Sequence, residues 1–285
     1  MSVASPRTLV EALDLLAHAT PDTRLLAGGT DLMVEFGTGR TGSDSVVNLW
    51  GLDELRGIVR EDGGLRLGAL TTCADMVQST AVQELDPILA AAADEVGAMQ
   101  IKNRATLGGN LGTASPAADL NPVLCALGAS VRLVSSAGRR DVLADEFLTG
   151  YRSTVRRPDE LIESVFLPAA APGRRAGFRK VGTRRAQSIS KVVVAVVLVL
   201  EPDRVASVRG FAGSVAERTL RLASLERLVG TRPTDADLLA VARAAAVEDA
   251  RPMDDVRSTA TFRRHVLRRV LTSLLAELLG DWPRA

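Results

Sequence analysis

Two glycine pairs, at positions 28–29 and 108–109, constrain this chain more than any other feature. The first pair lies in LLAGGTDLM (25–33), straight after an apolar run. The second pair lies in ATLGGNLGTASPAAD (105–119). Because glycine lacks a Cβ, it adopts positive φ easily and lets a ligand approach the backbone closely. Backbone N–H groups around successive glycines form concave anion sites, and small hydroxyls add donors without bulk. The two segments therefore suggest one shared ligand with a diphosphate, and two tight turns are the alternative.

Neither glycine segment has the spacing of a common nucleotide-binding motif. AGGTDL lacks the third glycine of the G-x-G-x-x-G fingerprint, and LGGNLG is not followed by the βα unit and distant acid that accompany that fingerprint. The sequence also has no Walker loop. A single acid near the second pair, Asp119, suits ribose or ribityl hydroxyls. From these residues alone, ligand binding and simple turns both stay open.

The balance of charges excludes some classes of partner. The net charge is +1, from 35 Lys and Arg residues against 34 Asp and Glu residues, so no global field attracts nucleic acid or an anionic membrane. The longest apolar run, 192–200, is far shorter than the ~20 residues of a membrane-spanning helix. We therefore expect no nucleic-acid partner and no membrane insertion. A length of 285 residues suggests about two domains.

Cysteine and histidine are too sparse for a metal centre. Cys73 and Cys125 stand apart, without the C-x-x-C spacing of zinc or iron–sulfur sites. His18 and His265 are the only histidines, which excludes a His-rich metal site and gives little support to a Ser-His-Asp triad. We expect both histidines on the surfaces of helices. We also expect no metal bound by this chain, and a reduced, cytoplasmic, soluble protein.

The first part of the chain mixes strands and helices. Thr8 and Glu11 form a capping-box pattern before leucines at helical spacing, so a helix is predicted ahead of the first glycine pair. Short apolar runs predict strands at 23–29, 45–50, 57–61, 65–70, 130–135 and 160–168. Helical patterns predict helices at 72–82, 86–97 and 119–129.

A run of small residues with one proline and two glycines, at 169–177, predicts a linker or domain boundary. Strands are predicted beyond it at 188–200 and 207–214, and helices at 219–230, 235–247 and 260–279. In the last helix an apolar row is expected to pack on a sheet or partner; it consists of Phe262, Val266, Val270, Leu274 and Leu278. Its solvated side is expected to carry Arg263, Arg264, Arg268 and Arg269.

Several motifs in a fixed order resemble a known family. They are LLAGGTDL, LRGI, LRLGALTT, IKNRATLGGNLGTASPAADLNPVL and FRKVGTRRAQSISKV, followed by AAVEDARPMDDVRSTATFRRHVL. In this order and spacing they resemble the FAD-binding subunit of the molybdenum hydroxylases, most closely the xanthine dehydrogenase branch. The resemblance covers nearly the whole chain.

The resemblance implies an α+β protein of two domains. Residues 1–170 would form a PCMH-type FAD-binding domain of two α/β subdomains, about 1–56 and 57–170, with FAD extended between them. Residues 175–285 would form a C-terminal α+β domain of the CO dehydrogenase flavoprotein type, which covers the cofactor.

The glycine segments and the resemblance together identify candidate FAD-binding residues. They are Leu25, Leu26, Ala27, Gly28, Gly29, Thr30, Asp31, Leu32, Thr106, Gly108, Gly109, Asn110, Thr113, Ser115, Asp119, Ile162 and Lys180. By the resemblance, Ile162 lines the flavin, and Lys180 reaches the cofactor from the C-terminal domain. Such a cation would stabilise a reduced, anionic flavin. Val96 falls where vertebrate relatives place an aromatic residue, so stacking is not expected there.

Each candidate also has a simpler interpretation. Thr30 and Asp31 are common turn formers, because their side chains bond local backbone. Asp119 stands where it could cap the following helix. Lys180 could be a solvated charge. The neighbouring pair at 184–185, Arg184 and Arg185, could regulate access of the electron acceptor or form surface ion pairs.

The resemblance also implies a function. This chain would carry FAD and pass electrons from iron–sulfur clusters to NAD+ or another acceptor, with no catalytic acid, base or nucleophile of its own. It would be active only with a small iron–sulfur subunit and a large molybdopterin subunit, as a dimer of heterotrimers. Carbon monoxide, an aldehyde or an aromatic N-heterocycle are alternative substrates of such a complex. A non-catalytic nucleotide-binding or assembly protein is the alternative from another class. A covalent flavin oxidase is disfavoured, since neither glycine segment has a nearby histidine or cysteine.

Overall fold

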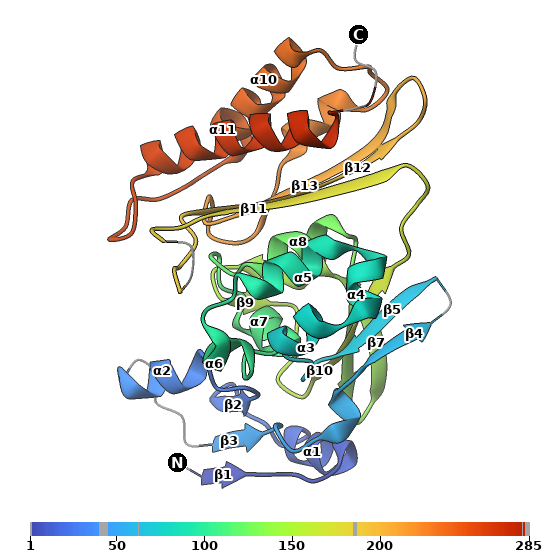
Figure 1. Cartoon of the computed structure of the whole chain (residues 1–285). Helices are drawn as coiled ribbons and strands as arrows, with labels where there is room; N and C mark the ends of the chain where they lie inside the picture. Colours follow the sequence, from blue (N-terminus) through green and yellow to red (C-terminus); the bar gives the residue numbers. More distant parts are fainter. Residues whose placement is uncertain (1, 40–44, 62, 185–186, 281, 283–285) are drawn as a thin grey trace.

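The computed structural model describes residues 2–39, 45–61, 63–184, 187–280 and 282. In the described part of the chain, three larger sheets are stacked along the molecule with helices between and beside them, and β8 and β9 form a fourth sheet of two strands (Figure 1). The first sheet has the strand order β1-β3-β2, the second β4-β5-β10-β6-β7, and the third β11-β12-β13-β14. The fold is therefore α+β, as predicted.

The first sheet is small and parallel. Its strands are β1 (Ser2–Ala4), β2 (Thr23–Leu26) and β3 (Ser45–Asn48). Parallel strands need crossover connections, and helices α1 (Leu9–Leu16) and α2 (Leu32–Gly37) lie in these crossovers. The Thr8 hydroxyl accepts from the Glu11 N–H, which confirms the predicted start of α1. The sequence patterns missed α2, which has no side-chain cap and no buried residue.

The second sheet is antiparallel and joins distant parts of the chain. Its strands are β4 (Ile58–Glu61), β5 (Gly64–Gly68), β6 (Ser130–Ser135), β7 (Gly138–Leu143) and β10 (Leu161–Pro168). β10 pairs with both β5 and β6, so it holds the sheet together. The connections of this part contain α3 (Cys73–Gln78), α4 (Thr80–Leu85), α5 (Pro87–Asp94), α6 (Met99–Lys102), α7 (Leu107–Thr113), α8 (Leu120–Ala126), α9 (Ala144–Phe147), β8 (Leu148–Gly150) and β9 (Ser153–Thr154).

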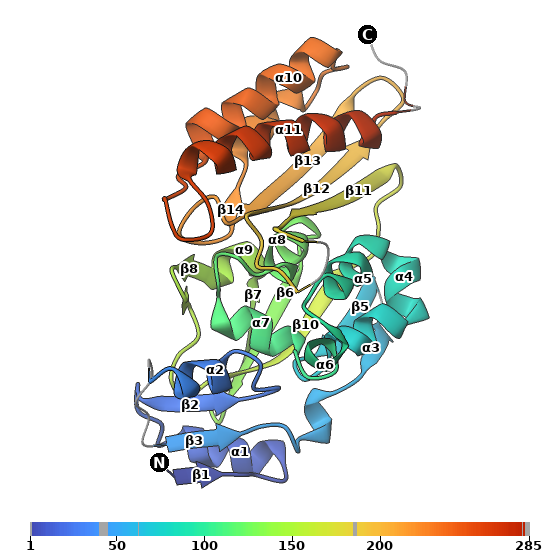
Figure 2. The ribbon, with the colours of Figure 1, turned by 60° about the vertical axis from the view of Figure 1, so that its left-hand side comes forward.

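The third sheet is buried on both faces. It contains β11 (Arg174–Val181), β12 (Val192–Leu200), β13 (Val205–Gly213) and β14 (Leu220–Arg221). Side chains alternate along a strand, so successive residues of β12 face opposite sides. Val193 and Ala195 join the core beneath α8, whereas Val192 and Val194 join the core with α10 (Asp235–Ala244) and α11 (Ala260–Leu278). Figure 2 shows these two long helices covering the outer face of the sheet.

Two predictions for the C-terminal part need correction. The segment 219–230 forms β14 and a 3₁₀ helix, Ala223–Leu228, instead of an α-helix. In α11 the predicted apolar row is right in part, because Leu274 and Leu278 are buried and Val266 and Val270 pack against the same core, whereas Phe262 is 40% exposed. The buried face also includes Arg263, Leu267, Leu271 and Leu275. An α-helix has 3.6 residues per turn, so residues spaced by four are rotated by about 40° relative to each other around the helix axis. Five residues at this spacing therefore do not all lie on the same face.

Arg263 is buried, although a solvated position was predicted. Its guanidinium donates to the carbonyl oxygen of Ser214 at 2.7 Å and to the Asp255 carboxylate at 2.8 Å. These partners compensate the charge, because a buried cation is tolerated when it is paired and hydrogen-bonded. Arg268 and Arg269 are exposed, as predicted. His265 is also exposed on α11, and His18 is exposed just after α1.

A buried ion pair joins the third sheet to α5. An Arg174 guanidinium nitrogen at the start of β11 lies 2.7 Å from the Asp86 carboxylate, and the two side chains are 8% and 4% exposed. Asp86 also caps α5 by accepting from the Ile88 N–H at 3.1 Å. Burial raises the pKa of Asp86 above its usual value, while the Ile88 N–H and the Arg174 cation oppose this shift. Arg174 thus stabilises the charged form of a carboxylate that positions α5.

Replacing Arg174 should destabilise the protein strongly. The substitution Arg174→Met leaves the Asp86 carboxylate buried without its cation, and we expect the free energy of unfolding to fall by about 3 kcal/mol. Urea unfolding measures this change. Arg60→Met is the control, because Arg60 pairs with Glu84 at the surface, where a pair contributes about 0–1 kcal/mol. Equal losses in the two variants would contradict the assignment.

Candidate functional site

A cavity of about 640 Å³ lies between the first sheet and the helices of the second. Its wall combines residues 23–35 with residues 96–118, and it also includes side chains from 152–162. This volume falls within the ~300–1,000 Å³ of small-molecule sites. The first and second glycine segments both line it, so the fold brings them to one place.

The first glycine segment connects β2 to α2 and touches the second segment directly. A Cβ on Gly28 would lie 1.6 Å from the carbonyl oxygen of Arg104, so only glycine allows this approach. Gly29 has a φ of 78°, which also favours glycine. The backbone N–H groups of Gly28, Gly29 and Thr30 donate to no acceptor among the described residues. These free donors form a potential anion site on the cavity wall.

The second glycine pair lies in the first turn of α7. The Thr106 hydroxyl caps this helix by accepting from the Gly109 N–H at 3.1 Å. The Asn110 Oδ1 atom is buried and has no hydrogen-bond partner in the described part of the chain, although Asn110 lines the cavity. An unpaired buried acceptor is costly, so a ligand that donates to it would be favoured.

Asp31 is held by an arginine from a distant loop. The Arg152 guanidinium lies 2.9 Å and 3.2 Å from the two carboxylate oxygens of Asp31 and also pairs with Glu35. Arg152 follows β8 and has a φ of 49°, in the left-handed region. The bridge crosses the cavity wall from the turn between β8 and β9 to α2. Asp31 is therefore more than a turn former, and its charge is already partly compensated.

Asp119 and Lys180 bind each other just behind the cavity wall. The Lys180 ammonium lies 2.7 Å from an Asp119 carboxylate oxygen and 2.8 Å from the carbonyl oxygen of Glu95. The Ser190 hydroxyl donates to the second carboxylate oxygen. Burial raises the pKa of Asp119, while Lys180 and Ser190 oppose the shift by stabilising the carboxylate.

Two of the simpler interpretations are therefore wrong. Asp119 stands at the first position of α8 but makes no side-chain capping bond, because its carboxylate is turned toward Lys180. The Lys180 side chain is only 5% exposed, so it is not a solvated charge. The pair connects α8 to β11 of the third sheet.

The structure places most of the predicted residues on one wall. All of them line the cavity except Leu26, Asp119 and Lys180, and Val96 lines it as well. The sequence patterns missed further lining residues, which include Arg24, Glu35, Leu49, Leu55, Leu70, Ile101, Arg152 and Arg156. The basic run around Arg152 and Arg156 was visible, but only folding brings it beside the glycine segments.

The remaining reactive groups lie away from the cavity. Cys73 and Cys125 are buried free thiols, and burial raises the pKa of Cys73 to about 12. Neither residue lines the cavity. Arg184 donates to the carbonyl oxygen of Gln187 at 2.7 Å, and Arg185 lies outside the described residues. The cavity wall thus offers backbone donors, hydroxyls, cations and apolar groups, which suit the binding of a large anionic ligand.

Comparison with known families identifies that ligand. Residues 1–170 match the FAD binding domain in molybdopterin dehydrogenase, and residues 176–278 match the CO dehydrogenase flavoprotein C-terminal domain. The chain belongs to this family of FAD-binding subunits. Its role as an FAD-containing oxidoreductase subunit follows from that membership, and FAD is the cofactor of its first domain.

Individual relatives span nearly the whole chain. The xanthine dehydrogenase FAD-binding subunit of Escherichia coli O157:H7 is 29% identical over 276 residues, covering 96% of this chain and 94% of its own. The glyceraldehyde dehydrogenase medium chain of Sulfolobus acidocaldarius is 29% identical over 271 residues, with 95% of each chain covered. A solved carbon monoxide dehydrogenase structure from Hydrogenophaga pseudoflava is 27% identical, has a TM-score of 0.94, and covers 99% of this chain and 98% of its own. Among the described residues, no helix has the length and apolar character needed to cross a membrane.

Enlarging Gly28 should abolish tight FAD binding. A methyl group in Gly28→Ala would clash with the Arg104 backbone, so the two glycine segments must separate. We expect the binding free energy to fall by more than ~1.4 kcal/mol, which is a tenfold loss of affinity. The purified variant should then retain less than about a tenth of the FAD that the parent retains. Gly37→Ala is the control, since nothing lies within 4 Å of its added Cβ. Absorbance after gel filtration measures the FAD content, and full FAD retention in Gly28→Ala would contradict this assignment.

Proposed function

We propose that FAD lies extended in the cavity and that this chain passes electrons from a partner's iron–sulfur clusters through FAD to NAD+ or another acceptor. The observation that supports this most strongly is the set of free N–H groups at Gly28, Gly29 and Thr30, in one cavity with the unpaired Asn110 Oδ1. The backbone N–H groups suit the diphosphate of a dinucleotide, and the Asn110 oxygen suits a ligand N–H or hydroxyl.

The candidate residues fit FAD by their chemistry. Ala27, Gly28, Gly29, Thr30 and their neighbours in 25–32 would hold the diphosphate and the adjoining part of the flavin. Thr106, Gly108, Gly109 and Asn110 would hold its other side, with the Thr113 and Ser115 hydroxyls farther along the wall. In the apolar part of the wall, Ile162 is only 7% exposed and offers an aliphatic surface to the flavin.

Asp119 and Lys180 are proposed to support the site from behind its wall. Asp119 follows Ala118, and Lys180 bonds the carbonyl of Glu95, which precedes Val96; both Ala118 and Val96 line the cavity. The pair therefore links the third sheet to two segments of the wall. A direct contact of either residue with FAD is part of this proposal.

The chain's own task in electron transfer is to bind and orient the cofactor. When bound, FAD would supply the redox chemistry that links one-electron donors to a two-electron acceptor. The wall contains no histidine or cysteine, and its acids include Asp31 and Glu35, which Arg152 engages. No side chain is therefore assigned as a catalytic acid, base or nucleophile.

The proposed assembly contains a small iron–sulfur subunit and a large molybdopterin subunit, doubled into a dimer of heterotrimers. Support comes from a relative described as a medium chain and from the match of residues 1–170 to the FAD binding domain in molybdopterin dehydrogenase. We place this complex in the cytoplasm, in keeping with the two cysteines that remain free thiols.

Xanthine or a related purine is the proposed substrate of the complex. The Thr30–Asp31 pair after the first glycines favours the xanthine branch, and the Escherichia coli relative supports it. The glyceraldehyde dehydrogenase chain is equally identical at 29%, so an aldehyde is the second candidate.

Spectroscopy of the complex tests this proposal. The chain is co-purified with its partner subunits, and visible spectra are recorded before and after addition of xanthine, then after NAD+. We expect the flavin and iron–sulfur bands to bleach with xanthine and NADH to form with NAD+. Bleaching by glyceraldehyde alone would keep the electron-transfer role and replace the substrate. A complex without flavin would contradict the assignment of the cavity, and flavin that no substrate reduces would favour a nucleotide-binding or assembly role.

A further inference from the structure

Three arginines line the cavity, and they differ in how their charges are compensated. Arg152 is neutralised by Asp31 and Glu35. Arg24 and Arg156 line the same wall, but no carboxylate lies within ion-pair distance of either among the described residues. Two cations therefore face the cavity without an anionic partner from the protein.

Arg156 is fixed in place by backbone carbonyl groups. One of its terminal nitrogens donates to the carbonyl oxygens of Arg157 at 2.9 Å and Glu160 at 2.7 Å. Its other N–H groups have no hydrogen-bond acceptor in the described ranges. Burial lowers the pKa of Arg156 below its usual value, and the nearby Arg24 charge acts in the same direction, while Glu160 and Asp159 oppose it. The guanidinium is thus positioned and partly desolvated.

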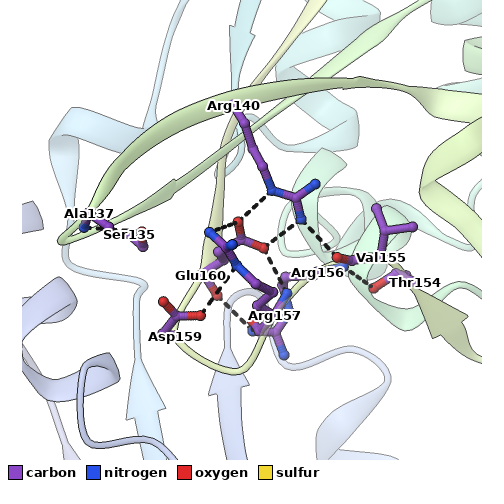
Figure 3. Close-up of polar contacts among 9 residues, drawn as sticks. All are labelled: Ser135, Ala137, Arg140, Thr154, Val155, Arg156, Arg157, Asp159 and Glu160. Atoms are coloured by element: carbon purple, nitrogen blue, oxygen red, sulfur yellow. Dashed lines mark hydrogen bonds and ion pairs between the residues drawn. The ribbon is translucent and has the colours of Figure 1, made fainter.

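The Glu160 carboxylate does not compensate Arg156, because other groups engage it. Figure 3 shows Arg140 and Arg157 around this carboxylate. Arg140 donates to its two oxygens at 2.6 Å and 2.8 Å, and Arg157 adds a guanidinium contact at 3.0 Å and a backbone N–H at 2.7 Å. Glu160 is 1% exposed, so these bonds satisfy a buried charge. Only its backbone oxygen is bonded to Arg156.

Arg24 approaches the same region from the first sheet. It lies on β2, three residues before Ala27. Three residues of an extended strand span ~10 Å, which is the backbone distance expected between Arg24 and Ala27. Arg24 forms no hydrogen bond or ion pair with any described residue, yet its charge is close enough to influence Arg156. Like charges repel, so their approach on a cavity wall is unfavourable unless an anion joins them.

We propose that Arg24 and Arg156 form a phosphate-binding subsite for the diphosphate of the dinucleotide, beside the free N–H groups of the first glycine segment. The inference rests on the proposed function, because it assumes that FAD occupies the cavity. A guanidinium presents donors in a planar fork that matches phosphate oxygens. An anion between the two cations would also relieve their repulsion and their desolvation. Arg140 and Arg157 would support the subsite by holding the turn that carries Arg156.

Binding measurements with FAD, ADP and adenosine test this subsite. The full chain is prepared without flavin, and calorimetry is performed on the parent and on Arg156→Gln and Arg24→Gln. A charge-assisted hydrogen bond contributes about 1.5–3 kcal/mol, so we expect each variant to bind FAD and ADP roughly 10- to 150-fold more weakly. Adenosine affinity should be unchanged, since adenosine has no phosphate. Arg204→Gln is the control, because its side chain is exposed, pairs with Glu201 at the surface and lies outside the cavity wall, and it should bind FAD as the parent does.

Several outcomes would overturn the subsite. Unchanged FAD and ADP affinity in Arg156→Gln and Arg24→Gln would do so directly. An equal loss of adenosine affinity would mean that the arginines contact the adenosine moiety or support the wall structurally. An equal loss in Arg204→Gln would show that the effect is not specific to the two cavity arginines. A parent chain that binds no FAD would contradict the proposed function itself, whereas normal FAD binding in the arginine variants contradicts only the subsite.

Discussion

The close contact between Gly28 and the Arg104 backbone determines how the rest of the site is built. A Cβ at this position would lie 1.6 Å from the Arg104 carbonyl oxygen, so the first sheet can approach the helices of the second only through glycine. This contact brings two segments, about 80 residues apart, onto one cavity wall. It also leaves the N–H groups that follow Gly28 free of partners in the described chain. Gly28 therefore permits the packing and also contributes its backbone N–H group to the anion site.

Ion pairs from distant segments then stabilise this wall. Arg152 bridges the turn between β8 and β9 to α2 through Asp31 and Glu35, and Lys180 bridges the third sheet to α8 through Asp119. Arg174 and Asp86 join the third sheet to α5. All three bridges connect segments that are distant in the sequence. The wall can therefore be held in one arrangement before a ligand is present, which reduces the ordering cost of binding.

Local sequence patterns predicted the elements well where one signal dominated. The β-branched run at 192–200 predicted β12, and Thr8 predicted the start of α1. The face of α11 was predicted only in part, because a buried Arg263 with Ser214 and Asp255 as partners cannot be inferred from hydrophobic spacing. The glycine pairs predicted a shared wall, but the partner of Asp31 stands 121 residues away, so no local pattern could indicate it. Arg24 and Arg156 were missed for the same reason, since only the tertiary fold brings them together.

The most direct test of this account is a crystal structure of the full chain with FAD bound. The account predicts that the diphosphate oxygens lie within hydrogen-bond distance, about 2.7–3.2 Å, of the backbone nitrogens of Gly28, Gly29 or Thr30. It also predicts that the second glycine segment, including Asn110, contacts the same molecule. FAD bound elsewhere, or bound in the cavity with its diphosphate away from both glycine segments, would contradict the central claim.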